Sequence, residues 1–231
     1  MLAGCEAAVP PAKMAPLGGL DPDTKGLVIL SADISPKHPT WNFTVPACAW
    51  YGVRCNATNG RVCCVEWVNM GLNGTPCLDS LPEYLYYLSL DENALTGTPD
   101  LTSLNLGLVT LILSNNAFSG IPDLSSLPKD LQSLDLSSNY FSGTPALTSL
   151  PEYLNYLGLE HNALTGTPDL SSLPKGLKHL YIWSNELSGN GTFTQNASWC
   201  VKAPPTAWQS MCVGDWNGLF DCAQGLWHCP I

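Results

Sequence analysis

Positive charge is scarce in this chain. Its 231 residues include nine lysines and arginines against 19 aspartates and glutamates, which gives a formal net charge of −10. The basic residues are scattered and form no polybasic run. A nucleic-acid binder needs a basic face, and an anionic membrane attracts clusters of lysine and arginine. We therefore expect neither nucleic acid nor an anionic membrane surface as a partner.

Long apolar runs are also missing. Residues 1–20 contain no apolar segment of the kind that a signal peptide carries, and no stretch is long enough to span a bilayer. We therefore expect no direct membrane insertion within these residues. The sequence leaves open whether a signal peptide or a membrane anchor lies outside the given chain.

Signatures of catalysis are absent as well. The sequence contains no nucleophile elbow, phosphate-binding loop, dinucleotide fingerprint or H-E-x-x-H motif. His161 and His179 are expected on neighbouring repeats, but two ligands are too few for a metal site. The sequence therefore predicts a protein that is not an enzyme, with no metal and no cofactor, and with N-linked glycans as its expected additions.

The strongest positive feature is an asparagine that recurs every 23 residues. The frame L-x-x-L-x-L-x-x-N-x-L surrounds each copy, and this frame is the signature of a leucine-rich repeat. The leucines before the asparagine should point into the core, and its amide should bond the backbone of the turns. The asparagines of this ladder, to which we assign a structural role, are Asn93, Asn116, Asn139, Asn162 and Asn185.

The fixed period predicts a leucine-rich-repeat solenoid of about six repeats. We expect a parallel β-sheet on the concave face, extended or 3₁₀ segments on the convex face, and disulfide-bonded caps at both ends. The expected parts are an irregular N-terminal arm over 1–40, a cysteine cap over 41–61, the repeats over 62–193 and a second cysteine cap over 194–231. The apolar run Leu27–Leu30 in the arm is too short to be assigned by its periodicity.

The ten cysteines lie outside the regular repeats. This placement is typical of disulfide-bonded caps in an oxidising compartment. Cys63 and Cys64 are adjacent, so strand alternation predicts that they point to opposite sides, and their pairing stays open, as does that of Cys5 and Cys77. Four cysteines allow three connectivities in the C-terminal cap. These four are Cys200, Cys212, Cys222 and Cys229.

Five N-x-S/T sequons also indicate the secretory route. None of them falls between Asn93 and Asn185. We therefore expect an extracellular protein, either secreted or displayed at a cell surface. The expected glycan acceptors are Asn42, Asn56, Asn73, Asn190 and Asn196.

In the N-terminal cap, Trp41-Asn42 is followed by the segment Cys48-Ala-Trp50-Tyr-Gly52-Val53-Arg-Cys55 and then by Arg61-Val62. This motif resembles the N-terminal cap of plant-type extracellular leucine-rich-repeat proteins. The unit Leu95-Thr-Gly97-Thr-Pro99 is similar to the L-x-G-x-I-P of that family, whereas the C-terminal cap looks more like those of protist leucine-rich surface proteins. The resemblance implies a disulfide between Cys48 and Cys55. It also implies binding as the common activity, because the family includes receptor ectodomains, enzyme inhibitors and surface antigens.

The variable positions of the sheet are the candidate binding site. Aromatic residues gather toward the C-terminal end of the concave face, and acidic residues line the same face. Aromatic anchors beside carboxylates suit a protein or a sugar ligand. The candidate ligand-binding residues are Tyr87, Asp91, Asp135, Tyr156, Glu160, His179, Tyr181 and Trp183.

Three functions compete at this point. The first is a recognition module that binds an extracellular protein or glycan through the concave face. The second is a self-assembling protomer of an extracellular coat or glycoprotein fibril, whose partners are copies of itself. Near-identical repeats at 85–101 and 154–170 favour this second function, and the run Leu27–Leu30 could add a strand to a neighbour's open edge. The third, implied by the family resemblance alone, is an inhibitor of a wall-degrading enzyme.

Overall fold

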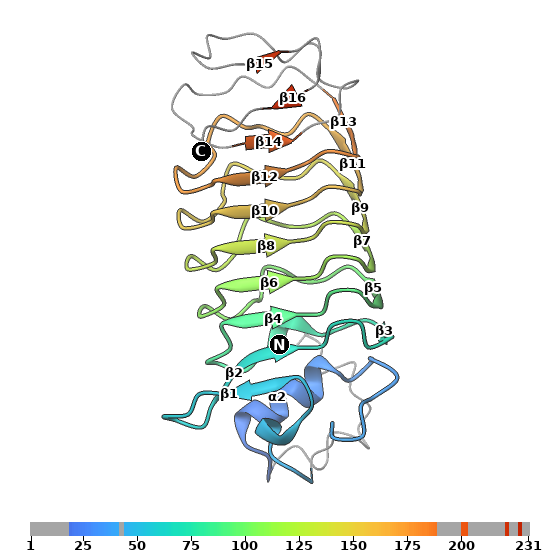
Figure 1. Ribbon diagram of the computed structural model, residues 1–231, viewed down its shortest axis with the longest axis vertical. Helices are drawn as coiled ribbons and strands as arrows, with labels where there is room; N and C mark the ends of the chain where they lie inside the picture. Colours follow the sequence, from blue (N-terminus) through green and yellow to red (C-terminus); the bar gives the residue numbers. More distant parts are fainter. Residues whose placement is uncertain (1–18, 42–43, 189–199, 203–219, 222–225, 228–231) are drawn as a thin grey trace, which may run out of the picture.

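The chain forms an elongated solenoid whose turns stack along the long axis of the molecule (Figure 1). This computed structural model describes residues 19–41, 44–188, 200–202, 220–221 and 226–227. The predicted leucine-rich-repeat solenoid with its parallel sheet is confirmed, since each 23-residue unit contributes one strand in register with the next. Leu88, Leu111 and Leu134, for example, are direct neighbours on successive strands.

One sheet of eight strands runs the length of the solenoid in the order β1-β2-β4-β6-β8-β10-β12-β14. All its pairings are parallel except that between β1 and β2. We call its solvent-facing side, which carries Tyr87 and Tyr156, the concave face. The strands are β1 (Val53–Cys55), β2 (Val62–Glu66), β4 (Tyr87–Ser89), β6 (Thr110–Ile112), β8 (Ser133–Asp135), β10 (Tyr156–Gly158), β12 (His179–Tyr181) and β14 (Cys200–Lys202).

A second parallel sheet follows the asparagine turns, with the order β13-β11-β9-β7-β5-β3. The sequence predicted extended segments after these turns but did not predict that they pair. Tight turning makes the pairing possible: Gly120 has φ of 84°, and a Cβ there would lie 2.3 Å from the hydroxyl of Thr98 one repeat earlier. The strands are β3 (Asn73–Gly74), β5 (Ala94–Gly97), β7 (Ala117–Gly120), β9 (Tyr140–Gly143), β11 (Ala163–Gly166) and β13 (Glu186–Leu187). Two short strands, β15 (Phe220–Asp221) and β16 (Leu226–Trp227), pair with each other.

The core is a continuous stack of leucines with two phenylalanines at its centre. The side chains that precede each asparagine turn, such as Leu134 and Leu136, are fully buried. Phe118 and Phe141 replace leucine in two successive repeats, and their rings stack with centroids 6.3 Å apart. This stack of buried apolar side chains supplies the main stabilisation of the repeats.

The asparagine ladder satisfies the backbone of the turns. In Asn139 the Nδ2 group donates to three carbonyls at 3.0–3.2 Å, and Oδ1 accepts from the N–H of Phe118 at 3.0 Å. Asn116, Asn162 and Asn185 repeat this arrangement, and each reaches back to the preceding turn. Each amide therefore joins two turns, which is the structural role that a buried turn requires.

The prediction of an irregular arm over residues 1–40 is wrong for Pro22–Leu30, which form helix α2. Asp21 caps the helix, because its Oδ1 accepts from the N–H groups of Asp23 and Thr24 at 3.1 and 3.0 Å, and Pro22 stands at the first helical position. Leu27 and Leu30 are fully buried in the solenoid's core. They therefore seal the first repeat of their own chain and are not free to pair with a neighbour.

A bidentate ion pair attaches α2 to the first long strand. The Nε and Nη2 groups of Arg61 each lie 2.9 Å from the carboxylate of Asp23, which also accepts the N–H of Val62 at 2.9 Å. The short 3₁₀ turns η3 (Ala47–Ala49) and η4 (Leu78–Ser80) complete this end of the molecule. The helix, the ion pair and these turns together form the cap that covers the open end of the core.

The disulfide Cys48–Cys55, which the family resemblance implied, is confirmed. Cys77 is disulfide-bonded as well, whereas Cys63 and Cys64 are free thiols. The expectation that these two neighbours point to opposite sides is wrong, because their sulfur atoms lie 3.8 Å apart. The predicted C-terminal disulfides involve Cys212, Cys222 and Cys229, which lie outside the described residues, and the side chain of Cys200, which does too.

The outer turns are held by short polar contacts. The carboxylate of Asp123 accepts the N–H and the hydroxyl of Ser125 at 3.0 and 2.6 Å, and Asp100 holds Thr102 in the same way. These contacts are Asx turns, which the Asp-x-Ser/Thr pattern favours. They lower the pKa of Asp123, first through the Ser125 hydroxyl and then through its N–H. In the described parts of the chain, no helix has the length and apolar character needed to cross a membrane.

Candidate functional site

The aromatic residues predicted at the C-terminal end of the concave face come together on β10 and β12. The rings of Tyr156 and Tyr181 have centroids 5.6 Å apart, and that of His179 lies 6.3 Å from Tyr156 and 6.2 Å from Tyr181. Their proximity follows from the strand register. Tyr156 is directly opposite His179, and Tyr181 lies two residues after His179 on β12, so it points to the same face. We call this group of three rings the aromatic cluster.

A glycine makes room for the aromatic cluster. Gly158 lies opposite Asp135 on β8 and Tyr181 on β12. A Cβ at Gly158 would lie 2.7 Å from Oδ1 of Asp135 and 3.2 Å from the hydroxyl of Tyr156. The carboxylate and the phenol thus both occupy the space that a side chain at residue 158 would fill. Sequence reasoning missed the importance of this glycine, although its place in a row of side chains on the sheet was a usable signal.

Two acidic side chains border the aromatic cluster. Asp135 is half-buried and accepts the hydroxyl of Ser137 at 2.6 Å, and Glu160 is half-buried on the turn that follows β10. Burial, followed by the negative charges of Asp135 and Glu160, raises the pKa of Tyr156. Tyr156 and Tyr181 are half-buried and His179 is exposed, so the cluster is a partly accessible aromatic surface beside two carboxylates. Such a surface favours positively charged groups.

Trp183 lies at the same end of the face, two residues after Tyr181 and just beyond the end of β12. Its ring meets that of His161 edge-on, with centroids 4.2 Å apart. His161 has φ of 54° and is exposed, in contrast to the half-buried Trp183. The sequence placed His161 only as one of two histidines on neighbouring repeats. Within the described residues no group of three potential metal ligands comes together.

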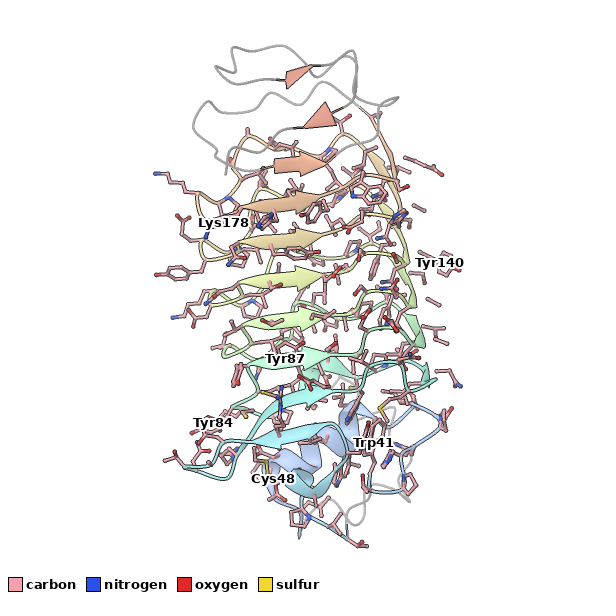
Figure 2. All side chains as sticks on the ribbon, viewed as in Figure 1. Trp41, Cys48, Tyr84, Tyr87, Tyr140 and Lys178 are labelled. Atoms are coloured by element: carbon pink, nitrogen blue, oxygen red, sulfur yellow. A yellow bond between two sulfur atoms is a disulfide. The ribbon has the colours of Figure 1, made fainter. Side chains whose placement is uncertain are left out.

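The structure separates Tyr87 and Asp91 from these residues. Tyr87 lies on β4, over the front of the sheet in Figure 2, and the strands β6 and β8 intervene before β10. At about 4.8 Å per strand, the distance along the axis is roughly 14 Å. Asp91 is engaged locally, since it accepts the hydroxyl of Ser114 at 2.8 Å and the amide of Asn115 at 3.1 Å. The eight candidate residues therefore form a dense C-terminal group and a sparse N-terminal pair.

A hollow of about 310 Å³ lies elsewhere, at the N-terminal cap. It is bordered by Asp21, Asp23, Pro46, Cys48 and Arg61. Its charged groups hold the cap together, because Asp23 is bound by Arg61 and Asp21 caps α2. This hollow is therefore explained by the fold, and the aromatic cluster is the better candidate for ligand binding.

The chain has recognisable relatives. Residues 130–150 match the family described as Leucine Rich Repeat. A crystal structure of a Pollen Receptor Kinase 3 matches with 26% identity and a TM-score of 0.62, covering 80% of this chain and 94% of that one. The BIR2 ectodomain from Arabidopsis thaliana matches with 28% identity and a TM-score of 0.56, covering 78% and 99%. No curated protein matches the sequence.

A third similar structure is the BIR3–SERK2 complex from Arabidopsis thaliana, at 26% identity and a TM-score of 0.51, covering 72% of this chain and 95% of that one. The chain thus has the leucine-rich-repeat solenoid fold, with structural similarity to plant receptor ectodomains. In that third structure BIR3 is in complex with SERK2.

Proposed function

We propose that this chain is an extracellular, non-enzymatic recognition module that binds a protein partner through the C-terminal half of the concave face. The observation that carries the proposal is the aromatic cluster of Tyr156, His179 and Tyr181 bordered by Asp135 and Glu160. Rigid aromatic side chains supply large contact area at low entropic cost, and they dominate the binding energy of many interfaces. The similarity to receptor ectodomains supports the same function.

The charge of the site favours a basic partner. The protein carries a net charge of −10, and the carboxylates of Asp135 and Glu160 lie beside the cluster. A lysine or arginine side chain could lie over an aromatic ring and near a carboxylate at once, which combines a cation–π contact with Coulomb attraction. A basic protein surface therefore fits better than a neutral sugar, and a glycan ligand is an outcome that the binding screen can reveal.

A test follows from the space at Gly158. Gly158→Ser should displace either Asp135 or Tyr156, since a Cβ would meet both. Because residue 158 has ordinary backbone angles, the fold should tolerate the change. The matched control is Ser89→Gly. It exchanges the same two residue types in the opposite direction, at the position of repeat 85–101 that corresponds to Gly158, and it lies outside the aromatic cluster.

The binding assay would screen extracellular proteins and a glycan array with the natively glycosylated chain. For the partner found, we expect Trp183→Ala, Tyr181→Ala and Gly158→Ser each to weaken binding at least tenfold, as truncation at an interface hot spot does. Tyr140→Ala removes an exposed tyrosine from β9, away from the sheet front (Figure 2), and should leave affinity unchanged. Wild-type affinity in all four variants would show that the C-terminal half of the concave face is not the binding surface.

The competing function, a self-assembling coat protomer, loses one of its supports. The run Leu27–Leu30 is helical and buried, so it offers no strand to a neighbour. We therefore expect a discrete monomer or dimer in light scattering across a wide range of protein concentrations. Open-ended oligomers that grow with protein concentration would favour the self-assembling protomer over the recognition module.

Within the described residues, two sequons have exposed asparagines, namely Asn56 and Asn73. We propose that both carry N-linked glycans in the secreted protein. Treatment with an N-glycosidase should convert each of these asparagines to aspartate in peptide mass spectrometry. Recovery of unmodified asparagine at both positions after expression through a secretory pathway would contradict this assignment.

A further inference from the structure

The first strand pair of the large sheet contains a β-bulge. Arg54 on β1 pairs with Cys64 on β2, whereas the next residue, Cys55, pairs with Val62. Cys63 is therefore an extra residue with no counterpart on β1. A bulge interrupts the alternation of side chains along a strand and redirects one of them. This is why two adjacent cysteines, which a regular strand would point to opposite sides, come together here.

The two thiols are in contact. The Sγ atoms of Cys63 and Cys64 are 3.8 Å apart, and the Cys63 thiol also donates to the carbonyl oxygen of Arg54 at 3.4 Å. Cys64 is 4% exposed, while Cys63 is half-buried and reachable from solvent. Cys48, Cys55 and Cys77 are disulfide-bonded, whereas Cys63 and Cys64 are free thiols.

We propose that Cys63 and Cys64 form a redox-active dithiol that closes reversibly to a vicinal disulfide. The oxidant is a small-molecule disulfide such as oxidised glutathione. The thiolate of Cys63, the more accessible sulfur, attacks one sulfur of that disulfide, forms a mixed disulfide and releases one thiolate. The Cys64 sulfur then attacks Cys63, closes the ring and displaces the second thiolate. The protons lost by the two cysteines appear on the two released thiols.

Geometry makes the closed form possible and easily reduced. A disulfide needs about 2 Å between its sulfur atoms, so the two must approach each other by roughly 2 Å. The Cα atoms of adjacent residues are about 3.8 Å apart, below the usual range of about 4.4–6.8 Å for disulfides. The ring is therefore strained, and a modest reductant can open it.

Closure would alter the start of the concave face. Cys64 is directly opposite Tyr87 on β4, and Tyr86 donates its backbone N–H to the carbonyl of Cys63 at 3.0 Å. On the other side, the ion pair between Arg54 and Glu66 bridges β1 and β2 at 2.5 Å. Twisting the strand at this pair changes contacts with both neighbouring strands. The pair is thus placed to couple redox state to the shape of the sheet's first edge.

The reduced pair should react slowly at neutral pH. Burial, and after it the hydrogen bond with the Cys64 thiol, raises the pKa of the Cys63 thiol, against the opposite effect of Arg54. The other ionisable groups near the pair are Tyr86, which is hydrogen-bonded to Cys64, Tyr87, which lies opposite Cys64 on β4, and Glu66, which pairs with Arg54. Because the thiolate is the attacking species, the exchange rate should rise as the pH rises.

The experiment uses the full chain in glutathione buffers of increasing oxidised fraction. Free thiols are blocked by alkylation, and the peptide that carries Cys63 and Cys64 is mapped by mass spectrometry. In oxidised buffer we expect this peptide to lose both alkylation sites, to weigh two hydrogen atoms less and to carry no glutathione. Dithiothreitol should restore both sites. The bond Cys48–Cys55 serves as the internal reference for a native disulfide.

Single variants separate a vicinal disulfide from other outcomes. Cys64→Ser should trap glutathione on Cys63, because no second thiol can displace it, whereas Cys63→Ser should react more slowly, because the remaining thiol is buried. The proposal is overturned if both wild-type thiols remain alkylatable in oxidised buffer. It is equally overturned if the wild type keeps glutathione as a stable adduct, or if either cysteine is found bonded to a cysteine elsewhere in the chain.

Discussion

Replacing one ladder asparagine should destabilise the solenoid by an amount that the hydrogen bonds allow us to work out. Asn139 is 6% exposed and lies in the central repeats. Its Nδ2 group donates to the carbonyls of Leu113, Leu136 and Ser137, and its Oδ1 accepts the N–H of Phe118. Asn139→Ala removes all four bonds at once and leaves a space too small and too polar to refill with apolar packing.

The four backbone partners are affected unequally. Each of the three carbonyls keeps another donor, namely Nδ2 of Asn116, Nδ2 of Asn162 or the N–H of Asn115. The N–H of Phe118 loses its acceptor. Losing the three hydrogen bonds to the carbonyls costs about 1 kcal/mol each, and leaving the buried N–H of Phe118 without an acceptor costs about 1–3 kcal/mol. Because the structure can relax in part, we expect the free energy of unfolding to fall by about 3–5 kcal/mol. In a protein of this size the loss corresponds to a fall in Tm of roughly 6–20 °C.

The assay is denaturant unfolding followed by circular dichroism, with hydrogen exchange as a local readout. Gln132→Ala is the control, because it removes an exposed amide side chain from the same turn and should cost little. In Asn139→Ala the amide of Phe118 should exchange faster than global unfolding allows. If the variant matches Gln132→Ala within about 0.5 kcal/mol, or if the amide of Phe118 keeps its protection, the reasoning about the ladder is refuted.

Three further predictions concern the core, the cap and the outer turns. Phe141→Ala should lower the free energy of unfolding by about 3–5 kcal/mol, since the ring is fully buried, and denaturant unfolding measures this loss. Replacing both Cys48 and Cys55 by serine should cost about 2–3 kcal/mol by the same measurement, because the bond closes a short loop. Hydrogen bonds from Ser125 lower the pKa of Asp123 in the folded state. Their stabilising effect is therefore fully present above the carboxyl pKa of the unfolded chain, about 3.9, and is lost as the pH falls through the lower pKa of the folded state. The difference in Tm between the wild type and Asp123→Asn should therefore be constant above about pH 5 and should shrink below about pH 4.

The repeat period was sufficient to predict the solenoid, because a fixed frame of leucines and asparagines permits only one stacking arrangement. Helix α2 escaped prediction because it is enclosed by the cap. Asp23, Thr24 and Gly26 are buried along with its leucines, so the helix has no polar face and no amphipathic period. Asp21 followed by Pro22 was a usable start signal, since aspartate caps helices and proline suits their first position.

The site was predictable in composition but not in detail. Register along parallel strands places Tyr156 opposite His179, and counting in steps of 23 residues reproduces that pairing. The bulge at Cys63 lies outside such counting, because it belongs to the antiparallel pairing of β1 with β2, whereas β2 and β4 keep the 23-residue offset, and no periodic pattern in the sequence marks it. The same is true of the approach of Tyr156 to Asp135, which depends on the side chain that Gly158 lacks.

The duplicated repeats show how a uniform scaffold can carry a local site. The segments 85–101 and 154–170 share their leucines, their asparagine and their glycine turn, which are the residues that stacking requires. They differ on the concave face, where Ser89 in the first copy corresponds to Gly158 in the second. Ser89 is buried within its row, whereas Gly158 leaves space that the hydroxyl of Tyr156 and the carboxylate of Asp135 enter. This exchange and the different residues on the adjoining strands change the surroundings of an otherwise equivalent tyrosine without disturbing the core. Glu66 and Thr110 take the places near Tyr87 that Asp135 and His179 take near Tyr156. Near-identity of the repeats is therefore compatible with specific binding, because stacking and recognition use different residues of the same strand.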